Sequence, residues 1–342
     1  MAIVAGIDLG GTAVNVTLLD SAQQRFLIEG LCEHPALATQ GPDVCVSQIA
    51  DGLAVAAARA GVSLDQIVAV GLDTPGPASV DGVLSARGST NFAHPAWAGF
   101  DLRGALQARL QRPVTYLNDG NAAALWGHTA LFGSDPRASS ISVIIGTGTG
   151  GGIVVDGRLV TGRNGFGGEV GHVLIPWRDI PGVETLEPRC NCGRTGDLES
   201  LCSLTGIRQT LLPHFLGRYP DHPLHGVEAG AAAMRVRGLA DAGDAMSREI
   251  FRVQARALAL FVDQMVNLFD PDGCLVGGGA LEASPAFRDW FIREVRAGLP
   301  HQREEQATMR IELMPNGDTA GARGAAIDAI RAFGLASDRC GR

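Results

Sequence analysis

The sequence has few of the features that mark basic, membrane-spanning or secreted proteins. Its 342 residues include no lysine, and its 28 basic residues form no run and are outnumbered by 36 acidic ones, so that the formal net charge is −8. An acidic balance disfavours nucleic acid or a membrane surface as a partner. No apolar run is long enough to span a bilayer. The N-terminal MAIVAGIDLGG also lacks the basic flank and the cleavage pattern of a signal peptide.

Cysteine is scarce, whereas glycine is abundant. Seven scattered cysteines, an odd number, argue against a disulfide framework and favour a reducing, cytoplasmic compartment. The 46 glycines are about twice the usual share, which predicts many turns where the backbone approaches another group closely. An apolar content of 46% with 19% charged residues supports buried cores, and the length suits two domains.

Strands alternate with helices along the chain, which predicts an α/β fold. Residues 2–20 form the pattern strand, glycine turn, strand, and residues 140–160 repeat it. This likeness predicts two related halves that each begin with a β-hairpin. Helices are expected over residues 43–60, 121–131, 249–269 and 318–333, and further strands over 67–76, 113–119 and 273–281.

A glycine-rich loop follows the first strand of each expected hairpin. In the stretch from Asp8 to Thr12 a carboxylate precedes two glycines and a hydroxyl, and residues 146–152 repeat the glycines. Glycines let backbone N–H groups approach a phosphate, and an acid can hold Mg²⁺. Neither loop is a Walker motif, because no lysine follows the glycines. One such loop is explained by a tight hairpin, but two at matching places favour a grip on one polyphosphate.

Three further segments allow both a structural and a functional interpretation. Gly277-Gly278-Gly279 is either a site for an adenosine or a strand-to-helix turn. Asp119, at the end of a strand, is placed to accept a proton from a substrate hydroxyl, to cap the following helix, or to do both. Glu169 and His172 are flanked by small residues and can both contact a polyol, or divide between substrate and metal. A histidine that stands alone is more often structural.

Together these segments resemble the ROK (repressor, ORF, kinase) group of sugar kinases within the actin-like ATPase superfamily. The resemblance runs from Asp8 to about Ala329. It rests on the motifs DLGGT (8–12), TPGP (74–77), STN with Trp97 (89–97), LNDGNAAAL (117–125), GTGTGGGIVVDGRL (146–159), GGEVGH (167–172), CNCGRTGDLES (190–200) and VGGGAL (276–281).

The resemblance implies two actin-like (ribonuclease H-like) domains with a cleft between them. The expected domains are a smaller N-terminal one over residues 1–120, joined by the helix at 318–333, and a larger one over 121–317. The larger domain would carry a metal-knuckle insertion at 172–202. Family habit also implies a homodimer.

The implied activity is an ATP-dependent hexose kinase that uses Mg²⁺ and acts on O6 of glucose or a related aldohexose. Kinases for N-acetylhexosamines, fructose or allose are alternatives, and polyphosphate remains a possible donor. Asp119 would be the general base. The sugar contacts would be Asn91, Asn118, Asp119, Glu169, His172 and Glu199. Phosphates would bind to Gly10, Gly11, Thr12, Thr147 and Gly148, with Asp8 near Mg²⁺ and with Gly278 and Gly279 near the adenosine.

A function from another class is a sugar-responsive regulator without catalysis, since the family includes repressors. Those repressors carry a helix-turn-helix segment before the first glycine loop, whereas only seven residues precede Asp8 here. The presence of Asp119 also favours an enzyme.

The segment PRCNCGRTGDLES (188–200) departs from the family pattern, in which one histidine and three cysteines surround zinc. With His172, Cys190 and Cys192 in place, Asp197 occupies the position of the last cysteine. Asp197 is then an oxygen ligand at roughly 2.0–2.2 Å, or Cys202 replaces it by another loop path, or zinc is absent and hydrogen bonds hold Asp197. The C-x-C pair with its histidine favours a metal. We expect the knuckle to orient Glu199 and His172 toward the sugar.

Overall fold

The computed structural model describes residues 2–85, 92–300 and 303–335. The chain divides into two compact units. The first unit comprises residues 1–134, 159–168 and 315–342, and the second comprises residues 135–158 and 169–314. The sequence predicts a boundary at residue 120, whereas the helix that follows this residue belongs to the first unit.

The first unit is built on a six-stranded sheet in the order β3-β2-β1-β5-β6, with β4 paired to β2. Strand β1 is antiparallel to β2 and parallel to β5, and β5 is parallel to β6. Because the carboxyl ends of parallel strands meet at one edge, the residues that end these three strands lie along that edge. The strands are β1 (Ile3–Leu9), β2 (Ala13–Asp20), β3 (Arg25–Phe26), β4 (Glu33–Pro35), β5 (Ile67–Thr74) and β6 (Val114–Asn118).

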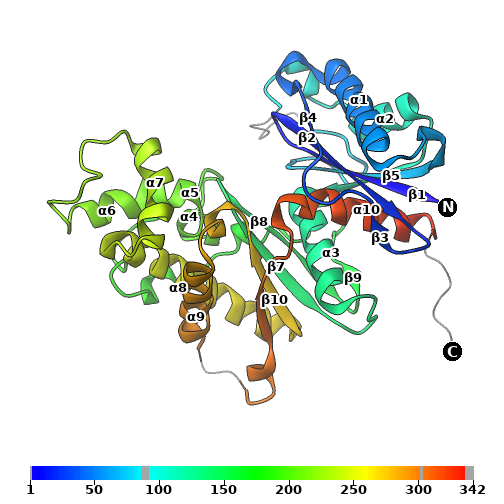
Figure 1. The fold of residues 1–342 in the computed structure, drawn as a ribbon. Coiled ribbons are helices and arrows are strands. Elements are labelled where there is room, and N and C mark those ends of the chain that lie inside the picture. The colour runs from blue at the N-terminus through cyan, green and yellow to red at the C-terminus, as the bar shows by residue number, and fades with distance from the viewer. Residues whose placement is uncertain (1, 86–91, 301–302, 336–342) are drawn as a thin grey trace. The chain divides into compact units, whose positions relative to one another are not determined.

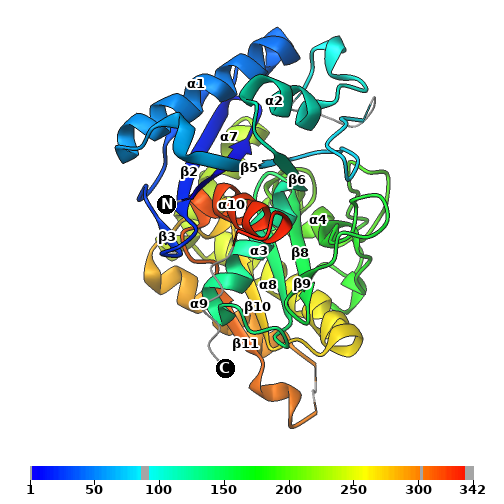
Figure 2. The ribbon, with the colours of Figure 1, turned by 90° about the vertical axis from the view of Figure 1, so that its right-hand side faces the viewer.

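Helices cover both faces of this sheet (Figures 1 and 2). Helices α1 (Pro42–Ala60) and α2 (Leu102–Leu110) share one apolar core with β1, and α3 (Asp119–Phe132) and α10 (Ala320–Ala332) share the other. Glycine is required where α10 crosses the sheet. A Cβ on Gly6 or Gly71 would lie 1.8 Å from a carbonyl oxygen of that helix.

The second unit repeats the arrangement in a five-stranded sheet, ordered β11-β10-β7-β8-β9. Here too the first strand of a hairpin is central, with its antiparallel partner on one side and two parallel strands on the other. The α/β fold and the two related halves expected from residues 2–20 and 140–160 are therefore confirmed. The strands are β7 (Ser140–Ile145), β8 (Thr149–Val155), β9 (Arg158–Leu159), β10 (Gly273–Gly277) and β11 (Arg310–Leu313).

The longest helix of the second unit is α8, which begins four residues before the predicted start at residue 249. Asp244 is its N-cap and accepts a hydrogen bond from the Ser247 N–H at 2.8 Å. The helices of this unit are α4 (Leu198–Leu201), α5 (Leu204–Gly206), α6 (Leu212–Leu216), α7 (Ala229–Asp241), α8 (Ala245–Phe269) and α9 (Pro285–Gly298). Within the described residues no helix combines the length and the apolar character needed to cross a membrane.

Candidate functional site

The carboxyl edge of the first sheet carries the predicted base. Asp119 is the first residue of α3 and directly follows β6. The preceding Asn118 is the N-cap, and its Oδ1 accepts the Gly120 N–H at 3.0 Å. Asp119 Oδ1 accepts the same N–H at 2.6 Å. Asn118 is therefore the N-cap, and Asp119, the first helical residue, is partly exposed.

The first glycine loop is the turn of the β1–β2 hairpin, at the same edge. The Gly10 N–H donates to the Ala13 carbonyl at 2.9 Å and closes the turn. Gly10 and Gly11 are partly exposed and Thr12 is exposed, so a ligand can reach their polar groups. Asp8 lies two residues before the turn, and burial of its carboxyl raises its pKa to about 6.

An acidic residue absent from the predicted site stands beside Asp8. Asp73 pairs with Asp8 in the register of β1 and β5, and it is completely buried. The sequence does indicate Asp73, as an acid near the end of the buried strand at 67–76, and Asp8 has the same kind of position. The prediction did not include Asp73 because no glycine loop directly follows it.

The second glycine loop connects β7 to β8 in the second unit. The Gly146 N–H donates to the Gly148 carbonyl at 2.9 Å, and the Leu204 N–H donates to the Gly146 carbonyl at 2.9 Å. The Thr205 hydroxyl donates to the Thr147 carbonyl at 2.8 Å. The loop is thus anchored by the first residues of α5, while Thr147 itself is exposed.

The predicted adenosine residues lie next to this loop. Gly278 has a φ of 95°, and a Cβ there would lie 2.4 Å from the Ile145 carbonyl oxygen. The glycine turn therefore packs against the end of β7, directly before the loop at residues 146–148. Gly277 to Gly279 form the expected strand-to-helix turn, which borders the predicted phosphate loop, and the adenosine site stays a prediction. The Gly279 carbonyl accepts a hydrogen bond from Arg237.

Three of the predicted sugar residues gather in the second unit. Glu169 is exposed when the whole residue is considered, but its carboxyl is partly buried, and this burial raises its pKa. The charge of His172 lowers the pKa of Glu169, and the charge of Glu199 raises it. Glu199 Oε2 accepts the Thr149 N–H at 2.8 Å, and the Cys190 thiol donates to Oε1 at 3.2 Å. Glu199 thereby joins the knuckle to the glycine loop. The predicted Asn91 lies outside the described residues.

The four knuckle residues come together as a candidate metal centre. One ligand atom from each of His172, Cys190, Cys192 and Asp197 lies within 4.8 Å of the others. Asp197 Oδ2 is 3.2 Å from His172 Nδ1 and 3.3 Å from Cys192 Sγ, and Cys190 Sγ is 3.7 Å from the same nitrogen. Tetrahedral zinc with bonds of about 2.0–2.3 Å separates its ligands by roughly 3.3–3.8 Å. The donor set therefore fits zinc.

One carboxylate oxygen of Asp197 faces the other knuckle residues, and the second caps a helix. Its Oδ1 accepts the Ser200 N–H at 2.9 Å and caps α4, while Oδ2 faces the histidine and the thiol. The alternative in which Cys202 replaces it is wrong. Cys202 is buried, and its thiol donates to the Gln254 carbonyl of α8 at 3.5 Å.

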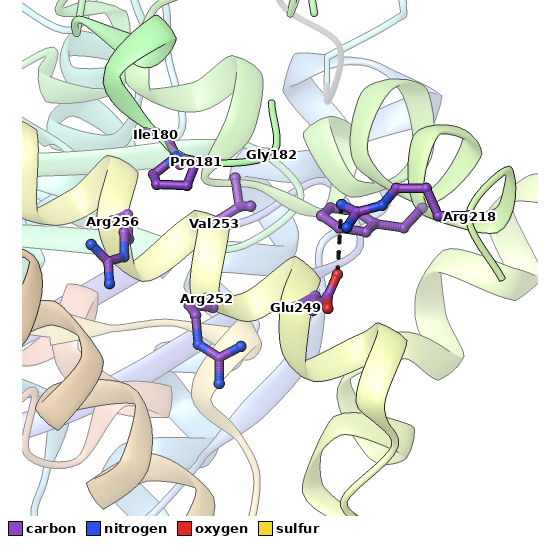
Figure 3. A pocket seen from close by; sticks show the side chains of 9 residues that line it. Ile180, Pro181, Gly182, Arg218, Glu249, Arg252, Val253 and Arg256 are labelled. Carbon is purple, nitrogen blue, oxygen red and sulfur yellow. Dashed lines mark ion pairs between the residues drawn. The ribbon is translucent and has the colours of Figure 1, made fainter. Parts of the chain in front are cut away.

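A surface pocket of the second unit contains none of the predicted site residues. It has a volume of about 290 Å³, and ion pairs neutralise two of its three arginines: Arg218 with Glu249 at 3.7 Å, and Arg252 with Glu294 at 3.2 Å. Figure 3 shows the first of these pairs at the pocket wall. The pocket is lined by Ile180, Pro181, Gly182, Phe215, Arg218, Glu249, Arg252, Val253 and Arg256.

Comparison with known proteins identifies the family. The profile of the ROK family matches residues 4–332. A glucokinase of Halalkalibacterium halodurans is 31% identical over 288 residues, which cover 81% of this chain and 80% of the relative. An N-acetyl-D-glucosamine kinase of Pectobacterium carotovorum is 32% identical over 332 residues, covering 94% and 97%.

A solved structure agrees with these relatives. The ROK family glucokinase of Streptomyces griseus, in complex with glucose and AMPPNP, aligns with a TM-score of 0.72 and 25% identity, covering 96% of this chain and all of that one. Since the family profile extends over nearly the whole chain, this protein belongs to the ROK family.

Proposed function

We propose that the protein is an ATP-dependent hexose kinase that transfers the γ-phosphate of ATP to a sugar hydroxyl, with O6 of glucose or a related aldohexose as acceptor. The observation that carries the proposal is the carboxyl edge of the first sheet, where Asp8 lies near the end of β1, the glycine turn follows β1, and Asp119 follows β6. The kinase activities of the relatives and their coverage of the chain support it.

In this proposal Asp119 is the general base. Its carboxylate accepts the proton of the sugar hydroxyl as the hydroxyl oxygen attacks the γ-phosphorus, and ADP leaves with the β–γ bridging oxygen. Phosphoryl transfer needs little covalent help from the protein, so that positioning and charge stabilisation supply most of the catalysis. The hydrogen bond from the Gly120 N–H holds the Asp119 carboxylate in place before the substrate arrives.

The glycine loops supply donors without side-chain charge. Gly10, Gly11 and Thr12 would contact phosphates from the first unit, and Thr147 and Gly148 from the second. Turns of this kind concentrate backbone N–H groups, which bind phosphate well. Asp8 would hold Mg²⁺, which neutralises charge on the phosphates when bound, and Gly278 and Gly279 would border the adenosine.

His172 can serve zinc and sugar at once, because its two ring nitrogens differ. Nδ1 faces Cys190 and Asp197. If Nδ1 binds zinc, the proton of the neutral ring must reside on Nε2, which is then a donor to a sugar hydroxyl. In this role His172, Cys190, Cys192 and Asp197 would hold zinc, which would fix the ring and the chain segment that leads to Glu199 and would take no part in phosphoryl transfer.

Asp119→Asn tests the base directly. Loss of a general base costs about 10²–10⁴-fold in rate, so kcat should fall by that factor while the calorimetric affinity for sugar is largely kept. Asp101→Asn is a matched control, since Asp101 caps α2 in the same unit. Equal phosphate transfer by wild type and Asp119→Asn would show that the base is wrongly assigned.

The acceptor is tested with a panel of sugars assayed by ADP release. The proposal expects the highest kcat/KM for glucose or a related aldohexose. A preference for N-acetylglucosamine, the substrate named for one relative, would instead assign the alternative within the family. Sugar binding without ADP release from any sugar would favour the regulator.

A further inference from the structure

Asp73 is a buried acid that the proposed reaction leaves without a role. Its side chain is 0% exposed, and apart from the adjoining carboxyl of Asp8 no hydrogen-bond partner reaches either carboxylate oxygen among the described residues. A buried polar group is normally satisfied, and a buried charge is normally paired or bound to a metal. Two acids that have only each other are satisfied while they share a proton, and a cation from outside the chain is required to hold both as carboxylates.

The side chain is directed toward the predicted cation site. In β1 and β5 the alternation of side chains places Asp8 and Asp73 on the face that carries Gly6 and Gly71, against α10. A Cβ on Gly321, in the first turn of α10, would lie 3.1 Å from Asp73 Oδ1 and 3.1 Å from Asp8 Cγ. Both carboxyls therefore occupy one small space below the N-terminus of the helix.

The described surroundings of Asp73 offer no compensating cation. The charges that face it are instead those of two more carboxyls, Asp8 and Asp119. The nearby Tyr116 hydroxyl bonds to Thr74 at 2.8 Å and not to either acid. The dipole of α10 is favourable, but it is small beside the cost of removing an ionised carboxylate from water.

We propose that Asp73 joins Asp8 in a carboxylate pair that binds the divalent cation of the phosphoryl donor. Asp8 is partly exposed and forms the entrance, while Asp73 supplies the second carboxylate from within. Mg²⁺ is commonly held by one or two carboxylates together with phosphate oxygens and water. Two negative charges balance its double positive charge, which a single Asp8 would not. That this cation accompanies the phosphoryl donor rests on the proposed function. That the two acids bind a divalent cation does not rest on it.

The test uses Mn²⁺ as probe and the full-length protein without nucleotide or sugar. Free Mn²⁺ is titrated by electron paramagnetic resonance against wild type, Asp73→Asn and the control Asp51→Asn, whose aspartate is exposed on α1. We expect one Mn²⁺ site in wild type and in the control, and an affinity at least ten-fold weaker in Asp73→Asn. Thermal melting should show the same pattern, with Mn²⁺ raising Tm in wild type but not in Asp73→Asn.

The Mn²⁺ titration of Asp73→Asn distinguishes a metal-binding pair of carboxylates from a purely structural pair. If Asp73 only shares a proton with Asp8, an asparagine that donates to Asp8 replaces it fully, and Mn²⁺ binding stays as in wild type. That result overturns the proposal, as does a wild type that binds no Mn²⁺. Should Asp73→Asn fail to fold, Asp73→Ser, which is smaller and retains a hydroxyl, is measured in its place.

Activity measurements distinguish this inference from the proposed function. In an active kinase, Asp73→Asn should raise the Mg²⁺ concentration needed for half-maximal rate at least ten-fold and leave the KM for sugar unchanged. A protein that binds Mn²⁺ through Asp73 but releases no ADP would contradict the kinase and leave the cation pair intact. An active kinase whose Asp73→Asn variant binds Mn²⁺ normally would contradict the pair alone.

Discussion

At the scale of single residues, Glu199 has an unusual position because it meets both the knuckle and the glycine loop. Its two carboxylate oxygens are occupied by different parts of the second unit, the Cys190 thiol on one side and the Thr149 N–H on the other. A ligand hydroxyl that bonds to Glu199 would therefore also affect the loop that is proposed to hold phosphate. Glycine at residue 148 leaves room for the Glu199 carboxylate, which a Cβ would displace.

Gly148→Ala should disturb this contact without unfolding the protein. The added Cβ would lie 2.5 Å from Glu199 Oε2, so the carboxylate must leave the Thr149 N–H. We expect kcat/KM to fall about 10–100-fold, on the order of 1.4–2.7 kcal/mol in transition-state stabilisation. Gly146→Ala is the matched control, because the nearest described atom would be 4.0 Å from its Cβ. Similar losses in both variants would show that the clash with Glu199 is not the cause.

At the scale of elements, the knuckle is an irregular segment held by backbone hydrogen bonds outside any regular sheet, such as Cys190 N–H to the Arg194 carbonyl at 2.8 Å and Gly196 N–H to the Pro188 carbonyl at 2.9 Å. Isolated bridges join Leu174 to Asp197 and Arg189 to Thr195, and Gly196 packs against the ring of Trp177. Burial raises the pKa of the Cys190 thiol, so that the metal-free segment carries a neutral thiol that zinc would convert to a thiolate. Zinc would add four bonds to a segment that its backbone already shapes.

Cys190→Ser should remove zinc and loosen this segment. We expect about one zinc atom per chain in wild type purified without chelator, much less in the variant, and a KM for sugar that rises as the segment that positions His172 and Glu199 loosens. Cys32→Ser, in the first unit, should retain the metal. Zinc far below one atom per chain in wild type, or unchanged kinetics in a folded Cys190→Ser protein, would refute this role.

The crossing of α3 and α10 is the second feature at this scale. A Cβ on Gly324 would lie 1.7 Å from the Ala122 carbonyl oxygen, so the two helices touch through their backbones. Gly324→Ala should lower the free energy of unfolding by about 3 kcal/mol or more, at the upper end of overpacking. Gly238→Ala on α7, where a Cβ meets no atom within 4 Å, should raise it by about 0.5–1 kcal/mol. Urea denaturation measures both, and equal effects would contradict the packing argument.

At the scale of the whole molecule, the two units share one sheet topology. Each unit places a hairpin strand at the centre of its sheet and a glycine turn after it. Among the described residues, the first unit carries acids near the ends of its parallel strands, Asp8 and Asp73, and the second carries the knuckle.

We predict that the chain forms a homodimer, from the habit of the family to which it belongs. Size-exclusion chromatography with light scattering should give twice the chain mass of 35.6 kDa at micromolar concentration. The formal charge of −8 per chain favours measurement at moderate salt, where repulsion between copies is screened. A mass equal to one chain over the whole concentration range would contradict the prediction.

The sequence by itself determined the hairpins, the main helices and the family. Local patterns suffice there, because the glycines of 8–12 and 146–152 and the apolar period of α8 depend only on neighbours along the chain. Helices α2, α7 and α9 escaped prediction. The nine residues of α2 are too few for a clear pattern, whereas α9 has an apolar face with Phe287, Phe291 and Val295 that the sequence does show and that was missed.

Only the tertiary structure decided which polar atoms are shared and which are left without a partner. Asn118 and not Asp119 is the N-cap of α3, Cys202 points away from the knuckle, and Asp73 has no hydrogen-bond partner but Asp8 among the described residues. Each of these facts depends on segments far apart in the sequence being brought together. The energy of a buried polar group is set by what surrounds it in space, which no local pattern of residues specifies.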